Sequence, residues 1–204
     1  MSVTTQEQQA AATAPPRRRR GLWVLGAVAV AAALVAVIAL LGGFNDVPIE
    51  KLPVIELGDT HSGNEVDTRI TGTYLTKQQP GYTFDADAGM QYFVVEATLL
   101  NTQDTTEVID TGLVRVLLGD EIAPADDPDG VVKAGTAFSL DFLQPGLEVR
   151  ALYFWLIPDT VAEGDDVVVG VFERHLVDDP RYGGAVYSSG EPMARVITTI
   201  GERG

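Results

Sequence analysis

The stretch that decides the fold is Gln91-Tyr92-Phe93-Val94-Val95-Glu96-Ala97-Thr98-Leu99-Leu100-Asn101. Successive side chains of a β-strand point to opposite faces, so Phe93, Val95, Ala97 and Leu99 share one face. The opposite face carries the mixed set Tyr92, Val94, Glu96 and Thr98. This alternation is typical of a half-buried strand, and it predicts that the first set lies in the core.

Similar β-rich runs, divided by clusters of Gly, Pro and Asp, continue to the end of the chain, and no stretch shows a helical period. We expect seven strands, at Arg69–Lys77, Gln91–Asn101, Gly112–Leu118, Thr136–Phe142, Leu147–Ile157, Asp166–His175 and Met193–Ile200. A further short edge strand is possible at 53–57, where Pro53 suits an edge better than a sheet centre. This pattern predicts an all-β fold, an antiparallel β-sandwich.

Two of the expected strands have informative faces. In the run 112–118, Val114, Val116 and Leu118 should share the core face. In the run 147–157, one face is apolar throughout: Val149, Ala151, Tyr153, Trp155 and Ile157. Its other face becomes apolar at Leu152, Phe154 and Leu156, which fits either a central strand covered on both sides or a partly exposed patch that docks a partner.

The N-terminal part of the chain predicts a membrane anchor. Residues 21–43 carry no charge, and 20 consecutive apolar core residues span about 30 Å as a helix, the thickness of a bilayer core. Four arginines, Arg17–Arg20, precede this run, so the N-terminus is expected in the cytoplasm and the rest of the chain outside it. The competing interpretation is a cleaved signal peptide, which would release a secreted product.

These features divide the chain into four expected parts. Residues 1–20 form a disordered cytoplasmic tail, 21–43 a transmembrane helix, 44–65 an extracytoplasmic spacer rich in Gly and Pro, and 66–204 the β-sandwich. The anchor makes the lipid bilayer the one expected non-protein partner.

The charge distribution follows the same division. The chain has 204 residues, 14 Lys plus Arg, 29 Asp plus Glu, no Cys and a net charge of −15. Residues 1–43 carry +3, so the remaining 161 residues carry −18. This acidic part should repel nucleic acid and, without bridging cations, anionic lipid as well. Without Cys there can be no disulfide or thiol chemistry.

Two segments resemble a known family. A glycine, an aromatic-valine strand and a closing Asn-Thr occur within Ala88–Thr102, and Leu143–Phe154 has a Pro-Gly turn that leads into a long apolar strand. Both resemble a bacterial immunoglobulin-like domain of unknown function. That group includes a small secreted antigen with a telokin-like sandwich and many membrane-anchored or lipoprotein ectodomains. The resemblance implies an immunoglobulin-like sandwich over 66–200; the acidic segment 120–130 and the segment 178–192 depart from it.

No motif for catalysis or cofactor binding is present. His61 and His175 stand outside any ligand-spaced cluster, and the serines lack a nucleophile elbow. We therefore expect no catalytic, cofactor-binding or metal-binding residues, although a hydrolase that uses carboxylates alone stays an alternative. The acidic run Asp120, Glu121, Asp126, Asp127 and Asp129 is expected to be a solvated loop, with calcium binding as its rival interpretation.

The expected function is a non-catalytic binding or scaffolding module, anchored by one span in the bacterial cell membrane and displayed outside the cytoplasm, with an unknown envelope protein as partner. The candidate contacts are an exposed sheet edge, the acidic loop at Asp126–Asp129, and the Leu152, Phe154 and Leu156 face.

Overall fold

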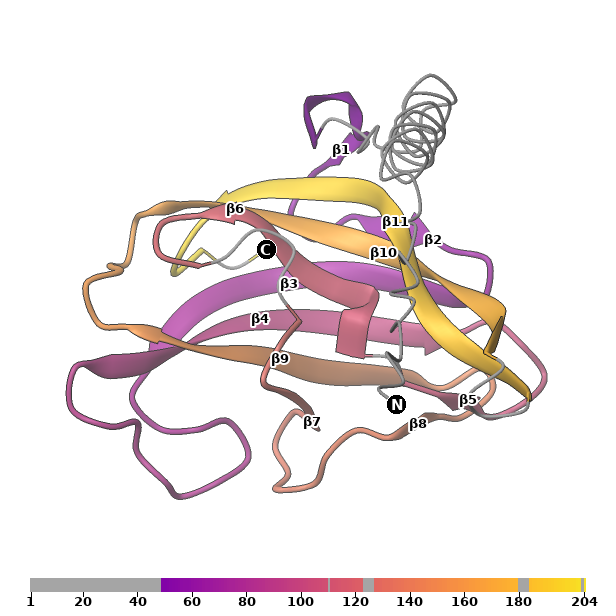
Figure 1. Ribbon diagram of the computed structural model, residues 1–204, viewed down its shortest axis with the longest axis horizontal. Helices are drawn as coiled ribbons and strands as arrows, with labels where there is room; N and C mark the ends of the chain where they lie inside the picture. Colours follow the sequence, from indigo (N-terminus) through magenta and orange to yellow (C-terminus); the bar gives the residue numbers. More distant parts are fainter. Residues whose placement is uncertain (1–48, 110, 123–126, 180–183, 203) are drawn as a thin grey trace, which may run out of the picture. The chain divides into compact units, whose positions relative to one another are not determined.

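The structure is a computed structural model that describes residues 49–109, 111–122, 127–179, 184–202 and 204. The described chain is built from strands and two short 3-10 helices, η1 (Ile49–Lys51) and η2 (Thr111–Leu113). The strands are β1 (Val54–Ile55), β2 (Thr60–Ser62), β3 (Val66–Thr76), β4 (Met90–Asn101), β5 (Glu107–Val108), β6 (Val114–Gly119), β7 (Gly130–Lys133), β8 (Phe142–Leu143), β9 (Glu148–Pro158), β10 (Asp166–Asp179) and β11 (Gly184–Thr199) (Figure 1).

These strands form a β-sandwich. One sheet has the order β1-β11-β10-β6, the second has the order β2-β3-β4-β9-β7, and β5 pairs with β8 in a small third sheet. All pairings are antiparallel except β1 with β11, which is parallel. One continuous core lies between the two large sheets, because Phe93 and Trp155 of one sheet and Val169 and Val196 of the other belong to the same buried cluster. The predicted all-β sandwich is confirmed.

The predicted core faces of the two longest expected runs are also confirmed. Phe93, Val95, Ala97 and Leu99 of β4 are fully buried. β9 pairs with β4 along its length, and its predicted inward residues belong to the same core. On the outer face, Phe154 is 3% exposed and packs with Val94 and Val132, whereas Leu156 is 40% exposed. A covered strand is therefore the correct interpretation at Phe154, while Leu156 reaches the surface.

The predicted face of β6 is wrong at one residue. Val114 and Val116 are buried as expected, but Leu118 is 57% exposed. The register between β6 and β10 shifts between Val168 and Val169, so a bulge at Leu117 reverses the alternation. Leu117 instead lies across Gly170, where an added Cβ would approach its side chain to 2.7 Å. The bulge leaves Leu117 buried and Leu118 outside.

The strand predicted at Thr136–Phe142 is not formed. Only an isolated bridge from Ser139 to Val132 and the short β8 (Phe142–Leu143) are paired there, and the ladder beside β9 is supplied by β7, which directly follows the expected acidic loop. Gly135 has a φ of +76°, and the Thr136 N–H donates to the Lys133 carbonyl at 3.1 Å. The chain therefore turns where a straight strand was expected.

The folded part begins earlier than residue 66. Residues 49–65, expected to belong to the spacer, contain η1, β1 and β2, and Leu52 is buried against Leu117 and Phe172. The predicted tail at 1–20 and transmembrane helix at 21–43 lie outside the described residues. Among the described residues, no helix is long and apolar enough to cross a membrane.

The open edge of β3 is covered by the C-terminal residues. β2 pairs with only the first part of β3. Beyond it, the Gly201 N–H donates to the Thr73 carbonyl at 2.8 Å, and the Gly204 N–H donates to the Thr71 carbonyl at 3.0 Å. These bonds close an edge that would otherwise be free to pair with another chain. The expected exposed-edge contact is thus not available along this strand.

Candidate functional site

The acidic loop distributes its carboxylates to separate protein donors. Asp127 Oδ1 lies 2.5 Å from the Arg115 guanidinium, and Asp129 Oδ2 accepts a hydrogen bond from the Leu156 N–H at 2.6 Å. Glu121 accepts a hydrogen bond from the Thr160 hydroxyl. Asp126 lies outside the described residues. β7 pairs with β9 only as far as Phe154, and the Asp129 carboxylate binds a backbone N–H of β9 beyond that point. Asp129 therefore stabilises the fold.

A hollow of about 260 Å³ lies beside this loop, between Asp120, Glu121, Thr160, Val161 and Asp165. Asp165 is already engaged, because its Oδ2 accepts the Ala162 N–H at 2.8 Å. In the part of the chain that the structure describes, no group of three or more His, Asp or Glu side chains could hold a metal ion. The hollow therefore offers acidic surface rather than a coordination sphere.

The two histidines lie on different sheets. His61 belongs to β2 of the five-stranded sheet, and His175 belongs to β10 of the four-stranded sheet, where its backbone pairs with Ser188.

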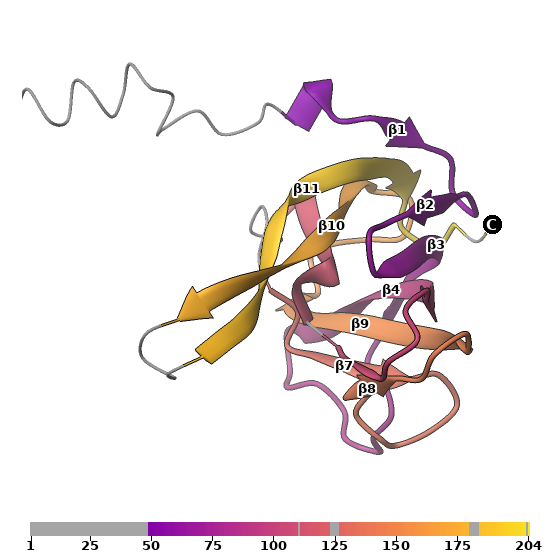
Figure 2. The same ribbon diagram turned by 90° about the vertical axis from the view of Figure 1, so that its right-hand side faces the viewer.

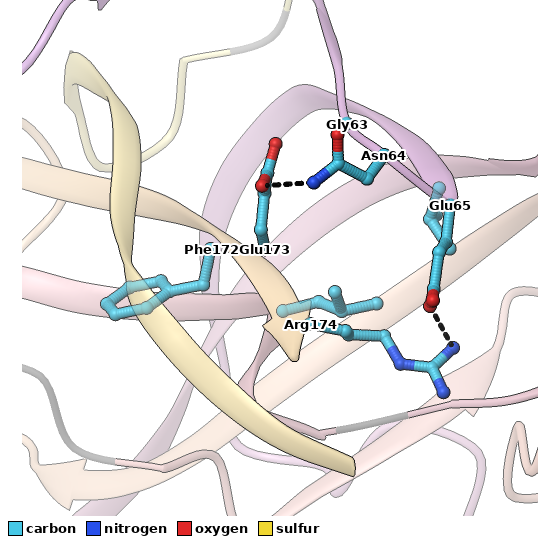
Figure 3. A pocket seen from close by; sticks show the side chains of 8 residues that line it. Gly63, Asn64, Glu65, Phe172, Glu173 and Arg174 are labelled. Carbon is cyan, nitrogen blue, oxygen red and sulfur yellow. Dashed lines mark hydrogen bonds and ion pairs between the residues drawn. The ribbon is translucent and has the colours of Figure 1, made fainter. Parts of the chain in front are cut away.

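The most deeply buried charge in the described chain is Arg174 on β10. Its side chain is 1% exposed and lies between two carboxylates, 3.8 Å from Glu65 Oε2 and 3.5 Å from Glu107 Oε2. Glu107 is itself 10% exposed and accepts a hydrogen bond from the Thr105 hydroxyl. Figure 3 shows Arg174 pointing toward Glu65, with Asn64 and Glu173 paired beside them at 2.9 Å.

This arginine is buried where the pairing of β10 with β11 becomes irregular. Val167, Val169 and Val171 face the core, so regular alternation would turn Glu173 inward and Arg174 outward. The register with β11 shifts between Val171 and Phe172 and again between Phe172 and Arg174, and both shifts place an extra residue on β11. Phe172 keeps the outward position that alternation gives it and packs with Leu52, whereas Arg174, beyond the irregular pairing, is buried beside Glu107. The sequence pattern does not reveal this cluster, since alternation assigns Arg174 to the outer face.

The cluster ties the parts of the fold together rather than binding a ligand. The cavity along it, lined by Gly63, Asn64, Leu113 and Arg174 among others, has a volume of about 10 Å³. That is space for one water at most. Arg174 comes from one large sheet, Glu65 lies just before β3 of the other, and Glu107 comes from β5. The ion pairs therefore fasten three sheets at one end of the sandwich.

Two neighbouring loops carry exposed aromatic side chains, among them Phe138 and Phe84, the two most exposed aromatic residues in the described part of the chain. Phe84 and Tyr82, on the β3–β4 loop, are 66% and 40% exposed, and their rings stack at 6.4 Å. Phe138, on the β7–β8 loop, is 76% exposed. The loops touch, because a Cβ added at Gly81 would lie 3.1 Å from the Thr136 carbonyl oxygen. Both loops lie on the side of the sandwich opposite β1 (Figures 1 and 2). We call Tyr82, Phe84 and Phe138 the aromatic loop surface.

Replacing Arg174 with alanine should lower the free energy of unfolding by about 3–5 kcal/mol, because two carboxylates would be left without their cation. Denaturation followed by the fluorescence of Trp155, which is buried, measures the change. The control is Lys77→Ala, whose ion pair with Asp159 is exposed and should contribute less than about 1 kcal/mol. Equal losses in the two variants would contradict the structural role of Arg174.

Comparisons with known proteins show only distant similarity. No protein-family model matches the sequence, and no curated protein matches it. An uncharacterized β-sandwich protein from Clostridium difficile is 13% identical, covering 73% of this chain and 94% of its own, with a TM-score of 0.42. A putative lipoprotein from Bacillus subtilis is 12% identical, covering 65% of this chain and 38% of its own, with a TM-score of 0.35.

Proposed function

We propose that this protein is a non-catalytic binding or scaffolding module of the bacterial cell envelope, held by a single span at 21–43 and displayed outside the cytoplasm. The observation that carries the proposal is the order of features along the chain. Four arginines precede an uncharged run long enough to cross a bilayer, and η1, the first described element of the β-sandwich domain, begins six residues after residue 43.

We also propose the immunoglobulin-like subtype for the sandwich. The two segments that resemble this family, 88–102 and 143–154, contain β4 and most of β9. These strands are neighbours and pair through eleven residue pairs, from Met90 with Pro158 to Leu100 with Glu148. The resemblance therefore falls on one contiguous structural unit, which is what a shared fold would produce.

The aromatic loop surface is the contact that we propose for the envelope partner. Exposed aromatic side chains are unusual on a surface that meets only water, and they supply large, rigid contact areas at binding sites. The Leu152, Phe154 and Leu156 face is less suitable, because Phe154 is buried beneath neighbouring side chains. The carboxylates of Asp127 and Asp129 in the acidic loop are already bound to protein donors.

The anchor and its orientation can be tested in cells. The full chain should stay in the membrane pellet after alkaline carbonate extraction and keep residues 1–43, as shown by mass spectrometry. External protease should degrade the β-sandwich while a cytoplasmic marker survives. Replacing Arg17–Arg20 with glutamate should reduce this accessibility, since the basic flank sets the orientation. A soluble product that begins after residue 43 would support the secreted alternative instead.

The aromatic loop surface can be tested by photo-crosslinking. A photoreactive aromatic residue placed at Phe138 should crosslink to another envelope macromolecule, and Tyr82→Ser with Phe84→Ser should abolish the product. These changes affect exposed side chains and should alter stability by less than about 1 kcal/mol. The control position is Glu163, exposed on the β9–β10 turn. Equal crosslinking from both positions would reject the surface.

A further inference from the structure

The outer face of the four-stranded sheet carries an apolar row whose two ends are exposed. Leu118 of β6 pairs with Val168 of β10, which pairs with Ile197 of β11, so the three side chains lie side by side across neighbouring strands. Leu118 is 57% exposed and Ile197 is 54% exposed. We call Leu118, Val168 and Ile197 the apolar row. Exposure of an apolar row across three strands to water is unfavourable, and such a surface is typical of an interaction site.

The chain enters the fold on this same face. Ile49 of η1 and the adjacent Leu52 pack with Leu117, Phe172 and Val168, and Val168 also belongs to the apolar row. η1 therefore covers one part of the face, and the apolar row continues beyond it. Figure 2 shows β1, which directly follows η1, next to β11 on the side of the molecule away from β7 and β8.

The length of chain before η1 limits how far this face can lie from a membrane. Gly43, the last residue of the proposed span, precedes Ile49 by six residues. A fully extended chain covers about 3.4 Å per residue, so η1 can lie no more than about 20 Å from the end of the span. That distance is shorter than a small domain is wide.

The net negative charge of the chain opposes its approach to an anionic membrane surface, but the charged residues on this face include two arginines. Next to the apolar row, Gly170 of β10 pairs with Arg115 of β6 on one side and with Arg195 of β11 on the other. Arg195 donates to the backbone carbonyl of Glu50 rather than to a carboxylate. Asp127 pairs with Arg115, and Asp166 lies at the start of β10. Arg115 is only 19% exposed and also lies over the ring of Phe172, so Arg195 is the arginine of this row that suits a surface of lipid headgroups.

From these observations we infer that the outer face of the four-stranded sheet rests on the bilayer, with the apolar row at the headgroup region and the aromatic loop surface turned away. The inference rests on the proposed membrane anchor and adds an orientation to it. The occupant of the face is the lipid surface to which the chain is tethered, and the partner contact is left free on the opposite side.

The absence of cysteine allows a direct test with the full chain, because each labelled variant carries one thiol. Leu118→Cys, Ile197→Cys and the control Phe138→Cys are labelled with an environment-sensitive fluorophore and reconstituted into phosphatidylcholine and phosphatidylglycerol vesicles that contain a lipid-bound quencher. All three positions are more than half exposed, so the fold should tolerate the change. We expect several-fold stronger quenching at positions 118 and 197 than at 138.

Each outcome decides the matter. Equal quenching at the three positions would overturn the orientation while the proposed anchor stands. Protection of positions 118 and 197 from an aqueous quencher without lipid quenching would mean that a second copy or another protein covers the face, which also overturns it. Protein that stays in the bottom fraction of a flotation gradient, apart from the vesicles, would overturn the anchor and the orientation together. Adding Leu118→Asp to the Ile197→Cys variant should weaken the lipid quenching if the apolar row makes the contact.

Discussion

The antiparallel pairing of β4 with β9 is the interaction on which the rest of the sandwich depends. It places Phe93 beside Trp155, with ring centroids 5.7 Å apart, and turns two fully apolar faces toward the same side. A surface of that size must be covered, and Val169 of β10 and Val196 of β11 supply the cover from the second sheet. The shorter strands add edges to this arrangement.

Two departures from regular alternation give the molecule its distinctive surfaces. The bulge at Leu117 buries that side chain and exposes Leu118, which creates part of the apolar row. Beyond the irregular pairing of β10 with β11, the cation of Arg174 is buried, and Glu65 and Glu107 hold it across the sheets. Both irregularities border β10, so this strand connects the core, the ion cluster and the proposed membrane face.

The long strands could be predicted from the sequence because their apolar periodicity is strong and their burial follows that pattern. Prediction failed where tertiary contacts decide the structure. β7 is held by its ladder with Phe154 and Tyr153 rather than by propensity, and the Thr136 turn depends on a positive φ at Gly135. The buried Arg174 could not be found because regular alternation along β10 assigns it to the outer face. The aromatic loop surface was likewise missed, since exposure of a loop residue is set by how the loops pack.

A short connection, as we propose, holds an acidic β-sandwich directly against the membrane that anchors it. Neutron reflectometry of the full chain in a supported bilayer measures this most directly, because it resolves protein, headgroups and water along the membrane normal. We expect protein density that continues from the headgroups without an intervening water layer. A water layer on the order of 20 Å, the full reach of the six-residue connection, would contradict the proposed contact.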